Sequence, residues 1–285
     1  MTVTGRCLCG DVVWQTTEPL DFMHHCHCSR CRKSHGTAFA TYALSAPANF
    51  RLLGGGDGIV RYASSPGFTR AFCGRCGSVV PEPGAAGDWV GIPIGSLDDD
   101  PGVRPIGHIF VGSKAPWYAI PDALPQFDAY PPDVDAPVLG KLPEVDAPGP
   151  GVRGSCVCGA VAFVVTGAPV RCQHCHCSRC RRARSAAHAS NFFTALDGVR
   201  FVRGEERLRS YKVPEARFFK QIFCDGCGAP MPRHDPDRNI AVVPLGSLDD
   251  DPPMRPQWHI YVGSKAPWFD IADALPQHPE GPPAA

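Results

Sequence analysis

The chain has 285 residues, and 28 basic side chains balance 28 acidic ones, so its formal net charge is zero. This balance gives no support to a protein that binds nucleic acid by charge, because such binding usually needs a basic surplus or a basic face. No apolar run approaches the ~20 residues of a membrane helix, and the N-terminus lacks the basic and apolar segments of a signal peptide. We therefore expect a cytoplasmic protein that binds neither nucleic acid nor a membrane.

Short strands are the elements predicted along the chain. Runs rich in Val, Ile and aromatic residues occur at 11–14 and 89–92, and again at 160–165 and 239–243, each next to Gly or Pro. No sustained 3.6-residue period indicates a major helix, and the 30 Gly and 31 Pro favour many turns. The sequence therefore predicts a mainly β fold built from antiparallel sheets.

The second half of the chain repeats the first. The segment GSLDDDP at 95–101 returns at 246–252, and GSKAPW at 112–117 returns at 263–268. Solenoid repeats are several times shorter than this period, so each unit is a whole domain.

We expect a first domain at 1–127 and a second at 151–277. The segment 128–150 between them is rich in Pro, Asp and Ala, which predicts an extended linker without a helix. The composition of 278–285 predicts a disordered tail.

Most of the 15 cysteines form one pattern that occurs twice. In each copy a Cys-x-Cys pair is followed by a Cys-x-Cys-x-x-Cys triplet and then by a Cys-x-x-Cys pair. The offset between the copies is 149 residues from Cys31 to Cys180 and 151 from Cys76 to Cys227. Seven thiols per copy is an odd number, which suits metal binding better than disulfide pairing. In a reducing cytosol such thiols serve as metal ligands, so the pattern predicts zinc.

The outer pairs of each copy predict a structural zinc site. A Cys-x-Cys or Cys-x-x-Cys turn directs two sulfurs at one metal, and two such pairs give a closed tetrahedral site. We expect these sites to stabilise the two domains. The predicted ligands are Cys7, Cys9, Cys73 and Cys76 in the first copy and Cys156, Cys158, Cys224 and Cys227 in the second.

The inner triplet predicts a second kind of zinc site. In the first copy, Cys26, Cys28 and Cys31 supply three ligands and leave the fourth position of a tetrahedral zinc for water or substrate, which is the arrangement of a catalytic zinc. The alternative is a fourth protein ligand, namely His24, His25 or His27, which would close the site and make it structural.

The second triplet consists of Cys175, Cys177 and Cys180. Cys172 lies three residues before it and can complete a four-thiolate set, which would close this site. The first triplet is therefore the better candidate active site. With one metal at each site, the sequence predicts about four Zn²⁺ ions per chain.

The combined motifs resemble those of the glutathione-dependent formaldehyde-activating enzyme family, also called the CENP-V/GFA family. They are CHCSRCR at 26–32, FCGRCG at 72–77 and SKAPW at 113–117, with counterparts at 175–181, 223–228 and 264–268. The resemblance implies a β-tent fold of small sheets in each domain, with a structural zinc on the outer pairs. It also implies a second zinc on the triplet, near which glutathione and formaldehyde meet.

The chemistry of an open zinc suggests a carbon–sulfur lyase. Metal coordination would hold a substrate thiol such as glutathione as thiolate, and this thiolate would add to formaldehyde or another aldehyde; the reverse reaction breaks the same bond. His27 can shuttle the proton or serve as a structural hydrogen-bond donor. Arg32 and Lys33 can bind a substrate carboxylate, balance the charge of the zinc thiolates or simply form a solvated surface. The alternative is a non-catalytic zinc scaffold or interaction module, so enzymatic activity is a hypothesis here.

Overall fold

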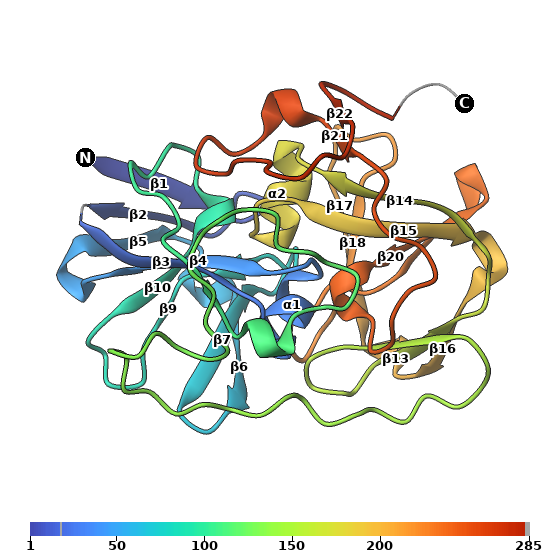
Figure 1. Cartoon of the computed structure of the whole chain (residues 1–285), viewed down its shortest axis with the longest axis horizontal. Coiled ribbons are helices and arrows are strands. Elements are labelled where there is room, and N and C mark those ends of the chain that lie inside the picture. The colour runs from blue at the N-terminus through green and yellow to red at the C-terminus, as the bar shows by residue number, and fades with distance from the viewer. Residues whose placement is uncertain (18, 283–285) are drawn as a thin grey trace.

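Six small β-sheets, three in each half of the chain, make up most of the computed structural model, which describes residues 1–17 and 19–282. The first half lies on the left in Figure 1, the second half lies on the right, and the two helices lie near the middle. The predicted mainly β fold of two domains is confirmed. Within the described residues, no helix is long and apolar enough to cross a membrane.

The first half contains sheets of three, five and three strands. In spatial order the strands are β1 (Thr2–Arg6), β2 (Val13–Thr17) and β5 (Phe50–Gly54); β11 (His108–Ile109), β3 (Leu20–Cys26), β4 (Ala40–Ser45), β10 (Val90–Pro93) and β9 (Glu82–Pro83); and β6 (Ile59–Ser65), β7 (Phe68–Cys73) and β8 (Val79–Val80).

The second half repeats this arrangement with sheets of three, six and two strands. In spatial order the strands are β12 (Val152–Ser155), β13 (Ala162–Val165) and β16 (Val199–Arg203); β19 (Arg233–Asp235), β20 (Ile240–Pro244), β15 (Ala189–Ala195), β14 (Pro169–Cys175), β21 (His259–Ile260) and β22 (Gln277–His278); and β17 (Leu208–Lys212) and β18 (Lys220–Cys224).

The sheets are antiparallel except at one edge of the largest sheet in each half. There β11 pairs with β3 in parallel, and β21 pairs in parallel with both β14 and β22. The linker at 128–150 contains no helix or strand and runs along the bottom of the view in Figure 1.

Part of the predicted disordered tail is paired with the second domain. His278 belongs to β22, and the carbonyl of Glu280 accepts a hydrogen bond from the backbone N–H of Tyr261 at 2.7 Å. Composition does not show such contacts, because they depend on residues elsewhere in the second domain. The last part of the predicted tail, 283–285, lies outside the described residues.

A short helix begins within each triplet and contains its third cysteine, and the absence of a helical period did not predict it. α1 (Ser29–His35) starts where the Sγ of Cys28 accepts a hydrogen bond from the backbone N–H of Cys31, and it ends at Gly36 in the left-handed region. α2 (Ser178–Arg184) starts in the same way at Cys177. A sulfur here takes the place of the usual oxygen of an N-cap. Seven residues are too few to show a helical period, so the start signal is the cysteine spacing itself.

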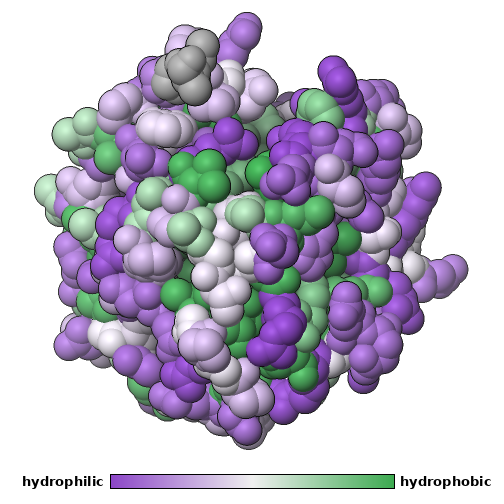
Figure 2. Space-filling model, turned by 90° about the vertical axis from the view of Figure 1, so that its right-hand side faces the viewer, coloured by the Kyte–Doolittle hydropathy of each residue, from purple (hydrophilic) through white to green (hydrophobic). Residues whose placement is uncertain are grey.

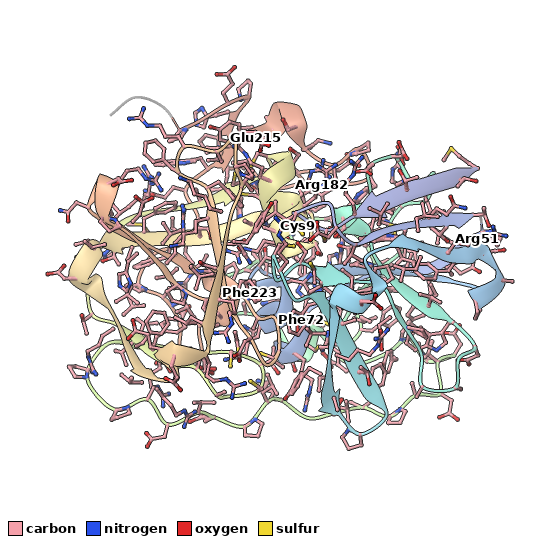
Figure 3. The ribbon with its side chains drawn as sticks, turned by 180° about the vertical axis from the view of Figure 1, so that it is seen from behind. Cys9, Arg51, Phe72, Arg182, Glu215 and Phe223 are labelled. Atoms are coloured by element: carbon pink, nitrogen blue, oxygen red, sulfur yellow. The ribbon has the colours of Figure 1, made fainter. Side chains whose placement is uncertain are left out.

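The two halves pack through reciprocal contacts. α1 packs against the 3₁₀ turn at Leu245–Ser247, and α2 packs against the equivalent turn at Ile94–Ser96. Rings of Phe72 and Phe223 meet edge to face at 6.3 Å between centroids, near the middle of the molecule in Figure 3. One hydrophobic core cluster also contains residues of both halves, so the domains share a core.

Ion pairs across this interface follow the same symmetry. The Nζ of Lys33, whose side chain is 5% exposed, lies 2.6 Å from Asp249 and donates to the carbonyl of Ser155. Arg182 occupies the equivalent position in the second half and pairs with Asp98. A buried charge is stable only when it is paired, so these contacts favour a single relative position of the domains.

Apolar residues on the outer surface are dispersed. Figure 2 shows the end of the molecule that lies on the right in Figure 1, where apolar residues form small groups among hydrophilic ones. The large exposed hydrophobics of the second half are Val170, Phe218 and Tyr261. The extensive apolar packing of the chain therefore lies inside and between the halves.

Because of the reciprocal contacts, we expect a single methyl group added at the domain interface to lower the stability of the protein strongly. A Cβ added at Gly246 would lie 2.3 Å from the backbone nitrogen of Thr37, and this backbone cannot give way without moving α1. We expect Gly246→Ala to lower the free energy of unfolding by about 3 kcal/mol, as overpacking does. Thermal and denaturant unfolding measure it. Gly58→Ala is the matched control, since a Cβ there meets nothing within 4 Å, and equal stability of both variants would contradict the prediction.

Candidate metal centres and their cavities

The structure brings the outer cysteine pairs of each half together. The sulfurs of Cys7, Cys9, Cys73 and Cys76 all lie within 4.8 Å of one another, and so do those of Cys156, Cys158, Cys224 and Cys227. The turn after Cys7 connects β1 to β2, and the turn after Cys73 connects β7 to β8, so two sheets meet at this group.

The spacing of these sulfurs fits a tetrahedral zinc. Four sulfurs at about 2.3 Å from one Zn²⁺ lie about 3.8 Å apart. The Sγ of Cys9 lies 3.3 Å from that of Cys7 and 3.6 Å from that of Cys73. The backbone N–H of Val12 also donates to the Sγ of Cys7 at 3.3 Å, a contact that stabilises a thiolate. The residues present therefore fit the metal that the pattern predicts.

The triplets form separate groups on a strand end and a helix start. Cys26 ends β3, Cys28 precedes α1 and Cys31 lies in its first turn, and their sulfurs lie within 4.8 Å of one another. Hydrogen bonds from Cys26 and Cys28 hold the pKa of Cys31 well below its usual value. Cys175, Cys177 and Cys180 form the equivalent group at β14 and α2.

Each triplet opens onto a cavity. The first has a volume of about 400 Å³, and Cys26, Cys28 and Cys31 form part of its wall. Most of the remaining wall is apolar or aromatic, including Trp89 and Phe110, and the linker closes one side with Tyr130 to Leu139. The Nη1 of Arg30 holds the linker in place by donating to the carbonyl of Gly140.

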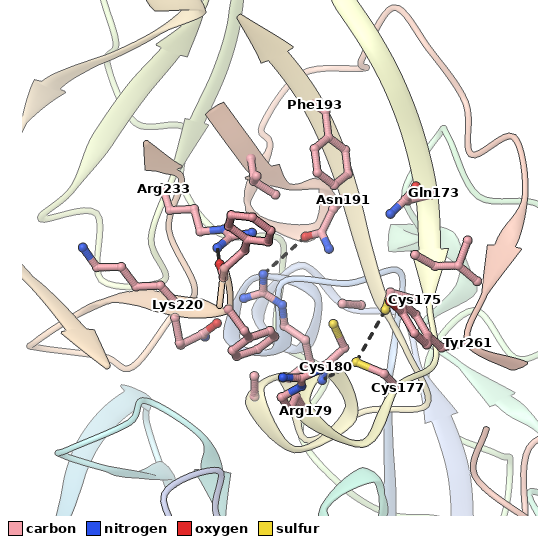
Figure 4. A pocket seen from close by; sticks show the side chains of 18 of the residues that line it. Gln173, Cys175, Cys177, Arg179, Cys180, Asn191, Phe193, Lys220, Arg233 and Tyr261 are labelled. Carbon is pink, nitrogen blue, oxygen red and sulfur yellow. Dashed lines mark hydrogen bonds between the residues drawn. The ribbon is translucent and has the colours of Figure 1, made fainter. Parts of the chain in front are cut away.

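The second cavity has a volume of about 320 Å³ and includes Cys175, Cys177 and Cys180. In Figure 4, Lys220 and Arg233 approach from one side and the cysteines from the other. None of the eight outer cysteines lines either cavity. The outer and inner groups therefore differ in that the triplets line these two cavities and the outer groups line neither.

Cys172 does not belong to the second triplet. Its side chain is fully buried in the core cluster shared by both halves, and burial raises its pKa to about 12. Residues three apart on a strand point to opposite faces; Gln173 and Cys175 of β14 face the cavity, whereas Cys172 faces the core. The sequence argument counted spacing along the chain and missed this alternation, so its reason for doubting the second site does not apply.

His27 and His176, the histidines between the first two cysteines of each triplet, face away from the cavities. The Nε2 of His27 lies 2.9 Å from the Nδ1 of His108, whose Nε2 contacts the carboxylate of Asp122 at 2.9 Å. An ionised carboxylate only accepts, so His108 donates to Asp122 and accepts from His27. Burial lowers the pKa of His27 to about 3. His27 therefore serves as a neutral hydrogen-bond donor to His108 within the first half, and it lines neither cavity.

The same chain recurs in the second half, where His176 contacts His259 at 2.8 Å and His259 contacts Asp273 at 3.0 Å. The rings of both halves meet around His188, which lies 4.5 Å from His174 and 5.7 Å from Phe39 between centroids. His24 lines the first cavity and His25 bonds to Thr41. None of these histidines joins a cysteine group in the described residues.

Arg32 and Lys33 were predicted near the metal, but neither lines a cavity. Lys33 pairs with Asp249 across the domain interface. The cation that does contact the first triplet is Arg70, whose Nη2 lies 3.5 Å from the Sγ of Cys31. Arg70 lies on β7, 39 residues away in sequence. No local motif connects it to the triplet, so sequence reasoning missed it.

Comparison with known proteins agrees with this architecture. The model of one family, described as glutathione-dependent formaldehyde-activating enzyme, matches residues 2–113 and again residues 151–264. The chain belongs to this family. The two matches contain all seven cysteines of the first pattern and all seven of the second. Family membership supports glutathione-dependent activation of formaldehyde as the general activity.

Among solved structures, a crystal structure of a Rhodobacter sphaeroides protein from a structural-genomics effort is similar to part of the chain. The two are 29% identical over 36% of this chain and 97% of that chain, with a TM-score of 0.31. No curated protein matches the chain.

The position of Cys172 predicts its dispensability for metal binding. Cys172→Ala should leave the zinc content per chain unchanged and cost about 1–2 kcal/mol of stability through lost core packing. Cys180→Ala is the matched change inside the triplet and should lose about one zinc ion. Atomic absorption on purified protein measures both. Loss of zinc from the Cys172 variant would show that the sulfur moves into the site.

The buried histidines predict acid sensitivity. Burial, and then His259, lower the pKa of His188 to about 3, below its unfolded value of about 6.5. Between these values the unfolded chain binds more protons, so the free energy of unfolding falls as pH is lowered through this range. We expect His188→Phe to reduce this loss of unfolding free energy by about 1–2 kcal/mol between pH 6.5 and 5. Phe is the residue that the first half has at the equivalent position.

Urea unfolding at several pH values measures the effect, because both proteins lose metal alike and the difference between them isolates His188. His234 is exposed, and His234→Gln is the control. A pH profile of His188→Phe parallel to that of the unchanged protein would contradict the prediction.

Proposed function

We propose that the chain is a zinc-dependent carbon–sulfur lyase of the cytoplasm. It condenses a thiol such as glutathione with formaldehyde or another aldehyde, or runs the reverse reaction. One observation carries this proposal: each three-cysteine group lies in the wall of a cavity, whereas the four-cysteine groups do not. A purely structural metal needs no access to such a space.

Cys26, Cys28 and Cys31 would hold one zinc ion, and Cys175, Cys177 and Cys180 another. When bound, such a zinc lowers the pKa of a thiol that enters its open position. Cys7, Cys9, Cys73 and Cys76, with the equivalent four residues of the second half, would hold the two structural ions. This gives about four per chain.

The chain's own residues supply charge and enclosure to the reaction. As the substrate sulfur bonds to the aldehyde carbon, the carbonyl electron pair moves to oxygen and needs a positive partner. In the first cavity Arg70 lies beside Cys31 and supplies this charge. The apolar wall with Trp89 and Phe110 excludes water and holds both reactants close together. The oxygen then takes up a proton, which matches the one that the thiol lost on binding, to give the hemithioacetal.

Tyr42 of this cavity is oriented from the other domain. The carbonyl of Arg184 accepts a hydrogen bond from the Nδ1–H of His35 at 2.6 Å, which leaves the Nε2 of His35 to accept from the Tyr42 hydroxyl at 3.0 Å. The lone pairs of Tyr42 thus face the cavity as an acceptor. Tyr42 therefore positions a donor group of the substrate instead of giving up its own proton.

The proposal predicts different outcomes for the two kinds of cysteine. Cys28→Ser should lose about one of four zinc ions, keep the fold and remove the thiol-dependent aldehyde consumption of the first site. Cys7→Ser should unfold the first domain, because structural zinc is coupled to folding. Metal analysis, circular dichroism and an aldehyde assay measure these results. Because thiols and formaldehyde also react spontaneously, the control without enzyme uses the same thiol concentration.

The second triplet offers a further control, since Cys177→Ser changes the equivalent sulfur. If aldehyde consumption is lost only when Cys28→Ser and Cys177→Ser are combined, both sites react. Full activity of the double variant, with two zinc ions remaining, would contradict the lyase proposal and favour a zinc scaffold.

A further inference from the structure

The two triplet cavities differ in the charge of their walls. Two arginines and one glutamate are the charged side chains of the first wall, namely Arg30, Arg70 and Glu82. Seven cationic side chains and no carboxylate line the second: Arg171, Arg179, Arg184, Arg217, Lys220, Arg233 and Arg238. The two halves are otherwise closely similar, so this difference is local to the cavities.

The differences occur at equivalent positions of the fold. Glu82 of β9 pairs with Gly91 of β10, and Arg233 of β19 pairs with Val242 of β20, in the same register. A carboxylate in the first half is thus replaced by a guanidinium in the second. On the neighbouring strand, Lys220 takes the position of Thr69 at the same offset of 151 residues.

Most of these cations have no carboxylate partner. Only Arg238 forms an ion pair, with Asp235 at 2.5 Å; across the described residues no acidic group lies within 4.0 Å of the other six. Arg184 is 8% exposed, and its Nη1 has no hydrogen-bond partner in the part of the chain that the structure describes. A buried guanidinium N–H without an acceptor is costly, and an anion in the cavity would accept a hydrogen bond from it.

The triplet thiolates do not account for so many cations. In the first half one half-buried arginine, Arg70, lies beside the sulfurs. In the second half Gln221 takes the position of Arg70, and Arg184 takes that of His35, so α2 supplies the single cation instead of the strand. The remaining cations of the second cavity exceed what three thiolates and a zinc ion need.

We propose that the cavity of the second domain binds a small molecule with two or more anionic groups, carboxylate or phosphate, whereas the first cavity takes a less charged one. Its volume of about 320 Å³ is sufficient for a tripeptide-sized molecule. Arginine forks bind carboxylate and phosphate in pairs of hydrogen bonds, so these cations also select the ligand. As a statement about the substrate of a triplet site, this inference rests on the proposed function.

The test uses a probe that cannot react. S-methylglutathione has two carboxylates and no free thiol, and its binding to the zinc-loaded protein is measured by isothermal titration calorimetry. Arg233→Glu installs the residue of the first half and should weaken binding about tenfold or more, the effect expected for one lost charge-assisted hydrogen bond. Glu82→Arg is the reciprocal control in the first cavity and should leave the affinity unchanged. Higher salt should weaken binding.

Two further arms identify the chemistry. The diethyl ester of S-methylglutathione lacks the carboxylate charges and should bind at least about tenfold more weakly. O-phosphoserine tests whether the cavity binds phosphate. Whichever of O-phosphoserine and S-methylglutathione binds more tightly shows whether phosphate or carboxylate is the preferred group. Lys220→Thr changes an exposed residue and gives a second variant if Arg233→Glu fails to fold.

Two results would overturn the inference. One is equal affinity of the protein for S-methylglutathione and its diethyl ester. The other is an affinity for S-methylglutathione that changes in Glu82→Arg but not in Arg233→Glu. Because the probe carries no thiol, loss of the aldehyde reaction would not affect this result. Anion binding without any lyase activity would therefore contradict the proposed function alone.

Discussion

The convergence of cysteine sulfurs from distant turns is the constraint on which each half depends. Cys7 follows a strand of one sheet and Cys73 ends a strand of another, yet their sulfurs belong to one group within 4.8 Å. The sheets are small, and the shortest strands have only two residues. Such elements bury little apolar surface by themselves, so a metal that joins them contributes directly to folding. The triplets then lie on a scaffold that the outer groups hold in place.

Strand alternation links the metal sites to the domain interface. On β14, Gln173 and Cys175 line a cavity, while His174 and Cys172 face the shared interior. The same strand thus presents a cysteine of the triplet on one side and an imidazole cluster on the other. Successive side chains of a strand point to opposite faces, so a histidine next to a cysteine of the triplet points away from it. This explains why these histidines do not join the cysteine groups.

Spacing in the sequence was enough to group the cysteines, because ligands to one metal lie on short turns. The mainly β fold could also be predicted from runs of Val and Ile next to Gly and Pro. Three features could not. Arg70 reaches Cys31 only through β7, the face of Cys172 depends on strand alternation, and Lys33 meets Asp249 only when the domains pack. Each of these requires contacts between residues far apart in the chain.

The reciprocal contacts have a consequence for how the two halves vary. Gly246 meets Thr37 as Gly95 meets Ala186, which is the pattern of an isologous interface between identical subunits. Here both partners belong to one polypeptide. In a homodimer every substitution appears at both sites at once, whereas a fused pair escapes this symmetry. Glu82 and Arg233, or Tyr42 and Asn191, can therefore differ while the interface stays matched, and one scaffold carries two independently adjustable cavities.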